Sequence, residues 1–75
     1  TGEYVLAEKE HVTLKVYNIL GQQVHTLVND WKEPGRHRLR WDGTNRYGER
    51  LGSGVYFLRL RAGTPSETQK AVLLR

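Results

Sequence analysis

Apolar and polar residues alternate along several short stretches of this chain, and this period of two restricts its fold more than any other feature. In residues 36–41, arginine alternates with histidine, leucine and tryptophan; in residues 12–16, valine and leucine alternate with threonine and lysine. Successive side chains of a β-strand point to opposite faces, so each stretch is expected to form a half-buried strand. No window carries the apolar spacing of an amphipathic helix.

Turns that contain glycine or proline separate these stretches. The spacing predicts loops at residues 29–35, 42–53 and 62–66. After the bend at residues 18–21 it predicts an irregular strand with either a bulge or a twisted edge. Three consecutive apolar residues, 72–74, predict a last strand that is buried on both faces or lies at a sandwich seam. Short strands at a spacing of about 8–12 residues indicate an all-β sandwich or barrel. The strands are expected at residues 3–7, 11–17, 22–28, 36–41, 55–61 and 67–74.

One group of residues is assigned to structure rather than to chemistry. Asp42 is expected to accept backbone N–H groups in the turn that follows it. Trp41 is expected in the core, and Tyr56 is expected to return its hydroxyl to the backbone, as in the tyrosine corner of immunoglobulin-like sandwiches. Glycines of the turns and strand starts complete the group, because they tolerate conformations that other residues avoid: Gly21, Gly43, Gly48 and Gly54.

Catalytic and metal-binding patterns are weak in this chain. It has no cysteine, and its histidines (11, 25 and 37) have no metal-ligand spacing. Ser53 lacks the surroundings of a nucleophile elbow. Residues 42–49 are rich in oxygen donors, but Arg46 places a positive charge where a calcium loop would bind its cation. We therefore expect no enzymatic activity, no cofactor and no metal.

The positive charge is concentrated in one block. The chain carries a net charge of +4, and residues 35–61 hold seven arginines against Asp42 and Glu49. Such a block either keeps a solvated strand face soluble or meets an anionic partner. Nucleic acid is not expected as that partner, because no recognition helix or platform of exposed aromatics accompanies the arginines. The candidate contacts with an anionic surface are Arg36, Arg38, Arg40, Arg59 and Arg61.

The length of 75 residues corresponds to one small domain, 1–75. The chain begins at Thr1 and contains no methionine, so we expect it to be a fragment of a larger protein. No apolar run approaches the roughly 20 residues of a membrane span.

Several motifs occur together in a particular order. They are the stretch 12–24 (VTLKVYNILGQQV), Pro34-Gly35, Trp41-Asp42-Gly43, Ser53-Gly54-Val55-Tyr56-Phe57 and the closing segment 70–75 (KAVLLR). In this order they resemble the C-terminal sorting domain of type IX secretion cargo (type A) in Bacteroidetes. They are also similar to the immunoglobulin-like domain of the flagellar hook-capping protein, which shares the Trp-Asp-Gly and Gly-Val-Tyr stretches. Such cargo domains often carry a Pro-Asn-Pro segment just before the first strand; this chain begins at Thr1, within or just before that strand, so the segment is absent or trimmed.

The resemblance implies an antiparallel immunoglobulin-like sandwich of about six or seven strands that acts as a secretion and sorting signal. Its partners would be the outer-membrane translocon, a surface sortase, anionic lipopolysaccharide and a fused upstream cargo domain. Its location would be secreted or at the cell surface of a Gram-negative bacterium. We expect the translocon to contact the last strand through Lys70, Val72, Leu73, Leu74 and Arg75.

Two alternatives stay open. The domain could be an accessory module that holds a secreted enzyme on a surface or polysaccharide, where an exposed Trp31 or Tyr47 could stack on a sugar ring. It could instead be a structural domain of a flagellar hook-capping protein.

Overall fold

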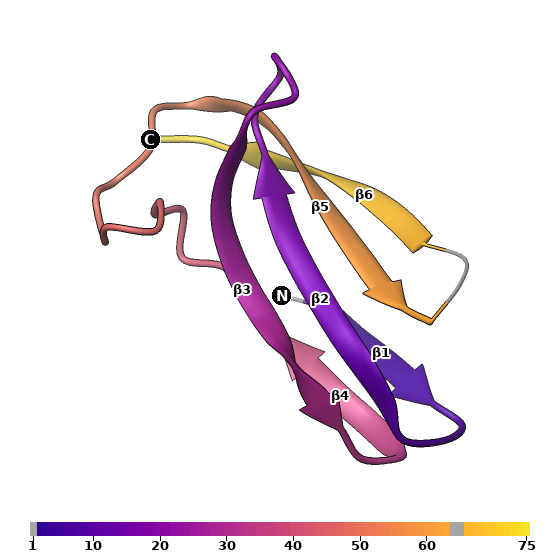
Figure 1. Ribbon diagram of the computed structural model, residues 1–75. Helices are drawn as coiled ribbons and strands as arrows, with labels where there is room; N and C mark the ends of the chain where they lie inside the picture. The colour runs from indigo at the N-terminus through magenta and orange to yellow at the C-terminus, as the bar shows by residue number, and fades with distance from the viewer. Residues whose placement is uncertain (1, 64–65) are drawn as a thin grey trace.

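A computed structural model describes residues 2–63 and 66–75, and these residues form six β-strands in two sheets (Figure 1). No helix capable of spanning a membrane occurs within these two ranges. The strands are β1 (Gly2–Leu6), β2 (Glu10–Tyr17), β3 (Gln23–Lys32), β4 (Gly35–Leu39), β5 (Gly54–Ala62) and β6 (Ser66–Leu73).

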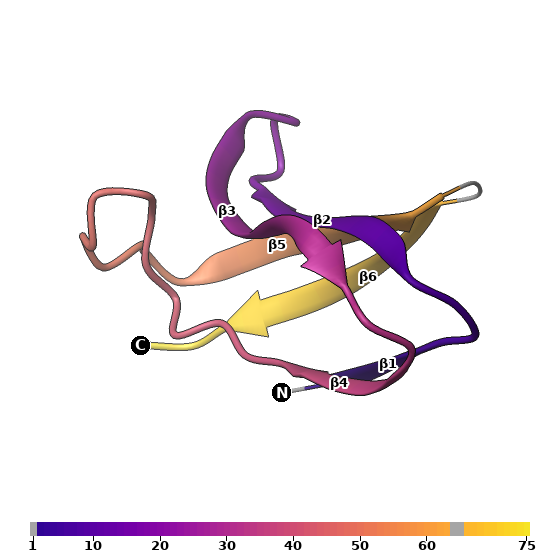
Figure 2. The same cartoon turned by 60° about the horizontal axis from the view of Figure 1, so that its bottom comes forward.

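All strand pairs are antiparallel. One sheet has four strands in the order β3-β2-β5-β6, and the other pairs β1 with β4. The short β1–β2 and β3–β4 connections place the two-stranded sheet against the larger one (Figure 2). The predicted immunoglobulin-like antiparallel sandwich is thus confirmed, with six strands in the part of the chain that the structure describes.

The core lies between the sheets, where the alternation of β2 predicts it. Val12, Leu14 and Val16 are almost completely buried, and Tyr56 and Leu58 of β5 pack beside them. Two side chains of β1, Tyr4 and Leu6, cover Val12 from the opposite sheet. Burying one such aliphatic side chain contributes roughly 1.5–3 kcal/mol, so β2 is the main source of stability.

Strand β3 is irregular in the predicted way but longer than predicted. Its register against β2 shifts twice, so that Val24 and Leu27 are the extra residues of two bulges. The strand also runs on to Lys32, although a loop was predicted from residue 29. Its pairing continues as far as Glu10, the first residue of β2. This tertiary pairing overrides the low strand propensity of Asn29 and Asp30.

The prediction for residues 72–74 is wrong. Among the described strands, β6 pairs only with β5 and forms an edge of the larger sheet. Val72 is 58% exposed and Leu74 is 84% exposed, whereas Leu73 packs against the core. An edge strand over an incomplete second sheet has one solvated face, so only every second side chain is covered. The predicted hairpin loop 62–66 includes residues 64 and 65, which lie outside the described part.

Candidate functional site

The turn-rich segment 42–53 is a folded loop held by its own backbone. The carboxylate of Asp42 accepts hydrogen bonds from the Thr44 amide (3.2 Å) and the Thr44 hydroxyl (2.6 Å). The hydroxyl contact is the main reason that the pKa of Asp42 is lowered, because it stabilises the ionised form. The Leu51 amide closes the loop by donating to the Gly43 carbonyl over 2.9 Å. The predicted turn role of Asp42 is therefore confirmed.

Side chains from two other segments converge on one carbonyl of this loop. The Thr44 carbonyl lies 2.9 Å from Trp41 Nε1 and 2.8 Å from His25 Nδ1. A carbonyl can only accept, so Nδ1 of His25 must carry a proton in this arrangement. Trp41 is half-buried and packs against the core cluster, as predicted.

The loop is also fastened to the bulged part of β3. The Arg46 amide donates to the Val24 carbonyl (3.0 Å), and its guanidinium donates to the Gln23 carbonyl (3.1 Å). Strand β3 forms an edge of the larger sheet, and Arg46 provides hydrogen-bond donors to two of its carbonyls. These contacts hold the loop against β3.

Tyr56 forms the predicted tyrosine corner. Its hydroxyl donates to the Gly52 carbonyl over 2.8 Å, and its ring meets Trp41 edge-on with centroids 5.2 Å apart. The other turn residues also behave as predicted, since Gly21, Gly43 and Gly48 have positive φ angles and Gly54 opens β5. This group of residues builds the fold.

The C-terminal residue completes the same end of the sandwich, which no sequence pattern indicated. The Arg75 guanidinium donates to the carbonyls of Leu51 (2.9 Å) and Gly43 (2.8 Å), and its amide donates to the Ser53 hydroxyl (2.9 Å). Gly43 is buried under this contact, and a Cβ there would lie only 2.5 Å from Arg75 Nη2 and 2.9 Å from Leu73 Cδ1. We call this end, made of residues 42–53, Tyr56 and Arg75, the braced end.

The residues predicted to meet a translocon thus fall into two groups. Lys70, Val72 and Leu74 are exposed along the edge strand and the residues that follow it. Leu73 packs on the core, and Arg75 is used by the braced end. Recognition of this segment stays a prediction, and its exposed members are the ones available for it.

The five arginines predicted as anionic contacts do not form one face. Arg36, Arg38 and Arg40 follow the outer side of β4, where Arg36 pairs with Glu3 over 3.6 Å. Arg59 and Arg61 lie on β5 in the other sheet, and Arg59 sits over the Tyr17 ring at 5.4 Å. Two facing sheets turn their outer sides in opposite directions. Contact with anionic lipopolysaccharide stays a prediction that concerns two separate surfaces.

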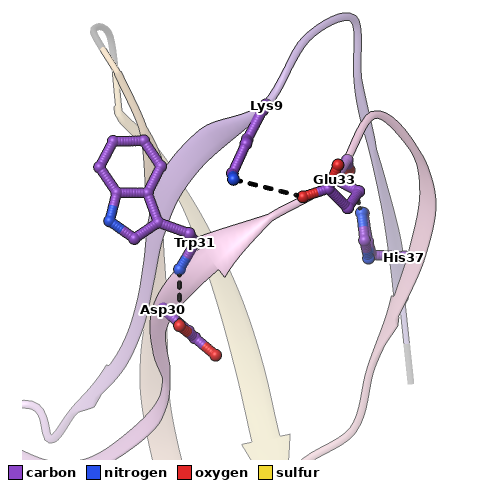
Figure 3. A network of polar contacts seen from close by, with 5 residues as sticks. All are labelled: Lys9, Asp30, Trp31, Glu33 and His37. Carbon is purple, nitrogen blue, oxygen red and sulfur yellow. Dashed lines mark hydrogen bonds and ion pairs between the residues drawn. The ribbon is translucent and has the colours of Figure 1, made fainter.

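At the end of the sandwich opposite the braced end, a polar network joins the β1–β2 connection to the β3–β4 connection (Figure 3). Lys9 pairs with Glu33 over 3.6 Å, and His37 Nε2 donates to the Glu33 carbonyl over 2.7 Å. Beside it, Trp31 is 60% exposed and meets His11 edge-on. The Trp31 ring borders an open groove of about 410 Å³ on the outer sheet face. Stacking of a sugar on Trp31 stays a prediction.

Across residues 2–63 and 66–75, no three side chains of histidine, aspartate or glutamate gather as they would around a metal ion. The arrangement instead offers sheet edges, an exposed aromatic and two arginine faces. Such features bind other molecules by surface contact.

Comparison with known proteins identifies a family. Residues 1–66 match the family model described as the FlgD Ig-like domain. A search among curated proteins found no match. The matched region covers β1 to β5 and ends at the first residue of β6.

Proposed function

Because the chain belongs to the family of FlgD Ig-like domains, we propose that it is a non-catalytic module in an extracellular bacterial assembly of the hook-capping type. The observation that carries this proposal is the family match over residues 1–66. The coarser statement, an immunoglobulin-like domain, rests on the same match and on the two antiparallel sheets.

The braced end supports a role in assembly. A module that joins subunits needs a surface whose shape is fixed before binding, because ordering a loop on contact costs affinity. Loop 42–53 is fixed by donors from β3 and from the C-terminal residue, although it contains no regular strand. Its exposed Tyr47 would then be presented in one orientation.

A domain exchange tests the proposal. The immunoglobulin-like domain of a hook-capping protein would be replaced by residues 1–75 in a strain that lacks the native protein, and hooks would be counted by electron microscopy. We expect hooks to form, and we expect none when the domain is deleted. If the chimera is secreted and circular dichroism shows it folded, but no hooks form, the hook-capping assignment is wrong.

A second candidate function is a sorting signal for an outer-membrane translocon. The observation that favours it is the edge strand β6, which exposes Lys70, Val72 and Leu74 and continues beyond the matched region. An exposed edge can pair with a receptor strand through its main chain, while alternate side chains provide selectivity. In this function a cargo domain is fused upstream. After export, a surface sortase would link that cargo to anionic lipopolysaccharide.

Matched substitutions separate recognition from folding in this second function. In a reporter fused to the domain, Val72→Ser with Leu74→Ser changes only exposed residues, whereas Leu73→Ser opens the core. We expect the exposed pair to retain the circular dichroism of the parent and to reduce surface delivery in a type IX secretion-competent strain. Normal delivery of that folded pair would remove the sorting function from this strand.

A further inference from the structure

The two sheets cover each other unequally. Four strands, β3-β2-β5-β6, face a sheet of only two. Because β4 follows β3 and β1 precedes β2 through short connections, the small sheet lies on the β2–β3 side of the larger one (Figures 1 and 2). In the described part of the chain, no strand continues the small sheet past β1 and beneath β5 and β6.

Two cavities, each lined by both apolar and polar residues, occupy this uncovered region. One of about 470 Å³ reaches Leu14, Leu58 and Leu60, which are core residues of the larger sheet. A second of about 300 Å³ runs along Tyr4, Val5 and Leu6 of β1 and shares Leu60 with the first. We call this joint space the strand slot. It is lined by β1, the inner side of β5, and the start of β6.

The edge of β1 makes the slot suitable for a strand rather than for a compact ligand. Strand β1 pairs with β4 alone among the described strands, so its other edge carries N–H and C=O groups without strand partners. A strand added there would lie about 4.8 Å from β1 and about 10 Å from the larger sheet. Its inward side chains would then meet Leu58 and Leu60. Main-chain pairing at such an edge provides affinity, and the apolar floor selects alternate side chains.

The charges at the slot define the partner further. Glu3 and Glu67 border both cavities, and Glu10 borders the second. Glu3 is paired with Arg36 over 3.6 Å, so Glu10 and Glu67 supply the negative charge of the slot, which contrasts with the net charge of +4 of the chain. The geometry points to the strand slot as a docking site for an extended segment of a partner protein in which apolar residues alternate with lysine or arginine. This inference goes beyond the proposed function, because it rests on the slot alone.

A designed peptide tests the docking site on the 75-residue chain. The probe is a fluorescent seven-residue peptide in which lysine and valine alternate, and binding is measured by fluorescence anisotropy and by amide chemical shifts. We expect binding that weakens as salt is added, with the largest shifts at the amides of β1 and at residues 67–69. A peptide in which glutamate and valine alternate is the matched control, and we expect it to bind at least about tenfold more weakly.

Three variants locate the contact. Leu60→Phe places a larger side chain in the path of an added strand and should weaken binding several-fold. Glu67→Lys reverses one rim charge and should weaken binding about two- to fivefold, because exposed ion pairs contribute little. Glu49→Lys makes the same charge reversal in loop 42–53 and should leave binding unchanged. Amide spectra would confirm that each variant is folded. If Leu60→Phe does not fold, the comparison of Glu67→Lys with Glu49→Lys still tests the docking site.

Several results would overturn the docking site. These are no binding of the lysine–valine peptide, equal binding of the glutamate–valine peptide, equal effects of Glu67→Lys and Glu49→Lys, or shifts confined to β3 or to the outer sheet face. A concentration-dependent dimer with protected β1 amides would show that a second copy of the chain fills the slot instead. None of these readouts depends on hook assembly or on secretion, so this inference can fail while the proposed function stands.

Discussion

The braced end and the strand slot show two opposite ways of finishing a small sandwich. At the braced end, Thr44, Gly43 and Leu51 accept hydrogen bonds from residues far away in the sequence, and the loop has little room for change. At the slot, Leu60 is only partly buried and β1 has an edge without a strand partner. Around Gly43 the first region resists even an added methyl group, whereas the second has space for a whole strand.

This difference indicates where a small domain can carry a binding surface without losing the stability of its fold. A chain of 75 residues buries only roughly 60% of its unfolded surface, so it has little stability to lose. The hydrogen bonds of the braced end hold a long loop without a large core beneath it. The slot leaves apolar surface available to a partner, which would complete the sheet on binding. The predictions below test this contrast from the largest expected effect to the smallest.

Gly43→Ala should produce the largest loss of stability. Gly43 has φ 78°, which costs alanine about 1–2 kcal/mol, and its new Cβ would collide with Arg75 and Leu73. We expect the free energy of unfolding to fall by about 2–4 kcal/mol in urea denaturation. Gly48→Ala is the matched control, because Gly48 has φ 79° with open space around it. Equal losses in the two variants would show that the contact with Arg75 contributes nothing.

Arg75→Ala should remove the guanidinium contacts with the loop. We expect a loss of about 1 kcal/mol, since Arg75 is largely exposed and its hydrogen bonds compete with water. The exposed Arg50 provides the control Arg50→Ala, with a change within about 0.5 kcal/mol. The double variant Gly43→Ala with Arg75→Ala should lose less than the sum of the single losses, because the collision disappears. Strict additivity would argue against the contact.

Leu60→Phe should be tolerated, because Leu60 lies at the strand slot. Adding atoms to a well-packed core costs typically about 1–3 kcal/mol, but Leu60 borders both slot cavities. We therefore expect the free energy of unfolding to change by less than about 1 kcal/mol in either direction. Val16→Phe, at a fully buried side chain that borders neither slot cavity, serves as the packed control and should be clearly destabilising. A large loss in Leu60→Phe would mean that the slot has no usable space.

Acid should slightly weaken the turn at Asp42 in the braced end. The hydrogen bond from Thr44 lowers the pKa of Asp42 in the folded state, so folding favours the ionised carboxylate. This contribution is fully present above the unfolded pKa of about 4 and is lost as pH falls through the lower folded value. The Thr44 amide shift should follow this titration in an NMR series from pH 6 to pH 2. In Asp42→Asn the same amide should show no such step, and an unchanged step would assign it to another group.

The alternation of residues predicts the strands well because it is a local property. Six strands, the buried side of β2, the bulged β3 and the tyrosine corner all follow from neighbours within a few positions. The order of strands in a sheet is not local, and for this reason the edge position of β6 was not predicted. The apolar residues 72–74 have the same composition whether a second sheet covers them or not.

The candidate binding features were predictable only in part. The exposed Trp31 and the arginines of β4 could be named from the sequence. The docking of Arg75 could not, because it joins residues 24 and 32 positions apart. The strand slot has no sequence signal either, since it arises where β1 ends the small sheet. The division of five arginines between two sheets likewise depends on topology rather than on pattern.

Amide hydrogen exchange of the 75-residue chain tests the contrast between the braced end and the strand slot most directly. The account predicts that the amides of Arg46 and Leu51, which bond to Val24 and Gly43, exchange nearly as slowly as those in the middle of β2. It also predicts that the amides of β1 exchange considerably faster and become protected when the lysine–valine peptide is added. Fast exchange throughout loop 42–53, together with strong protection of β1 in the free chain, would contradict the account.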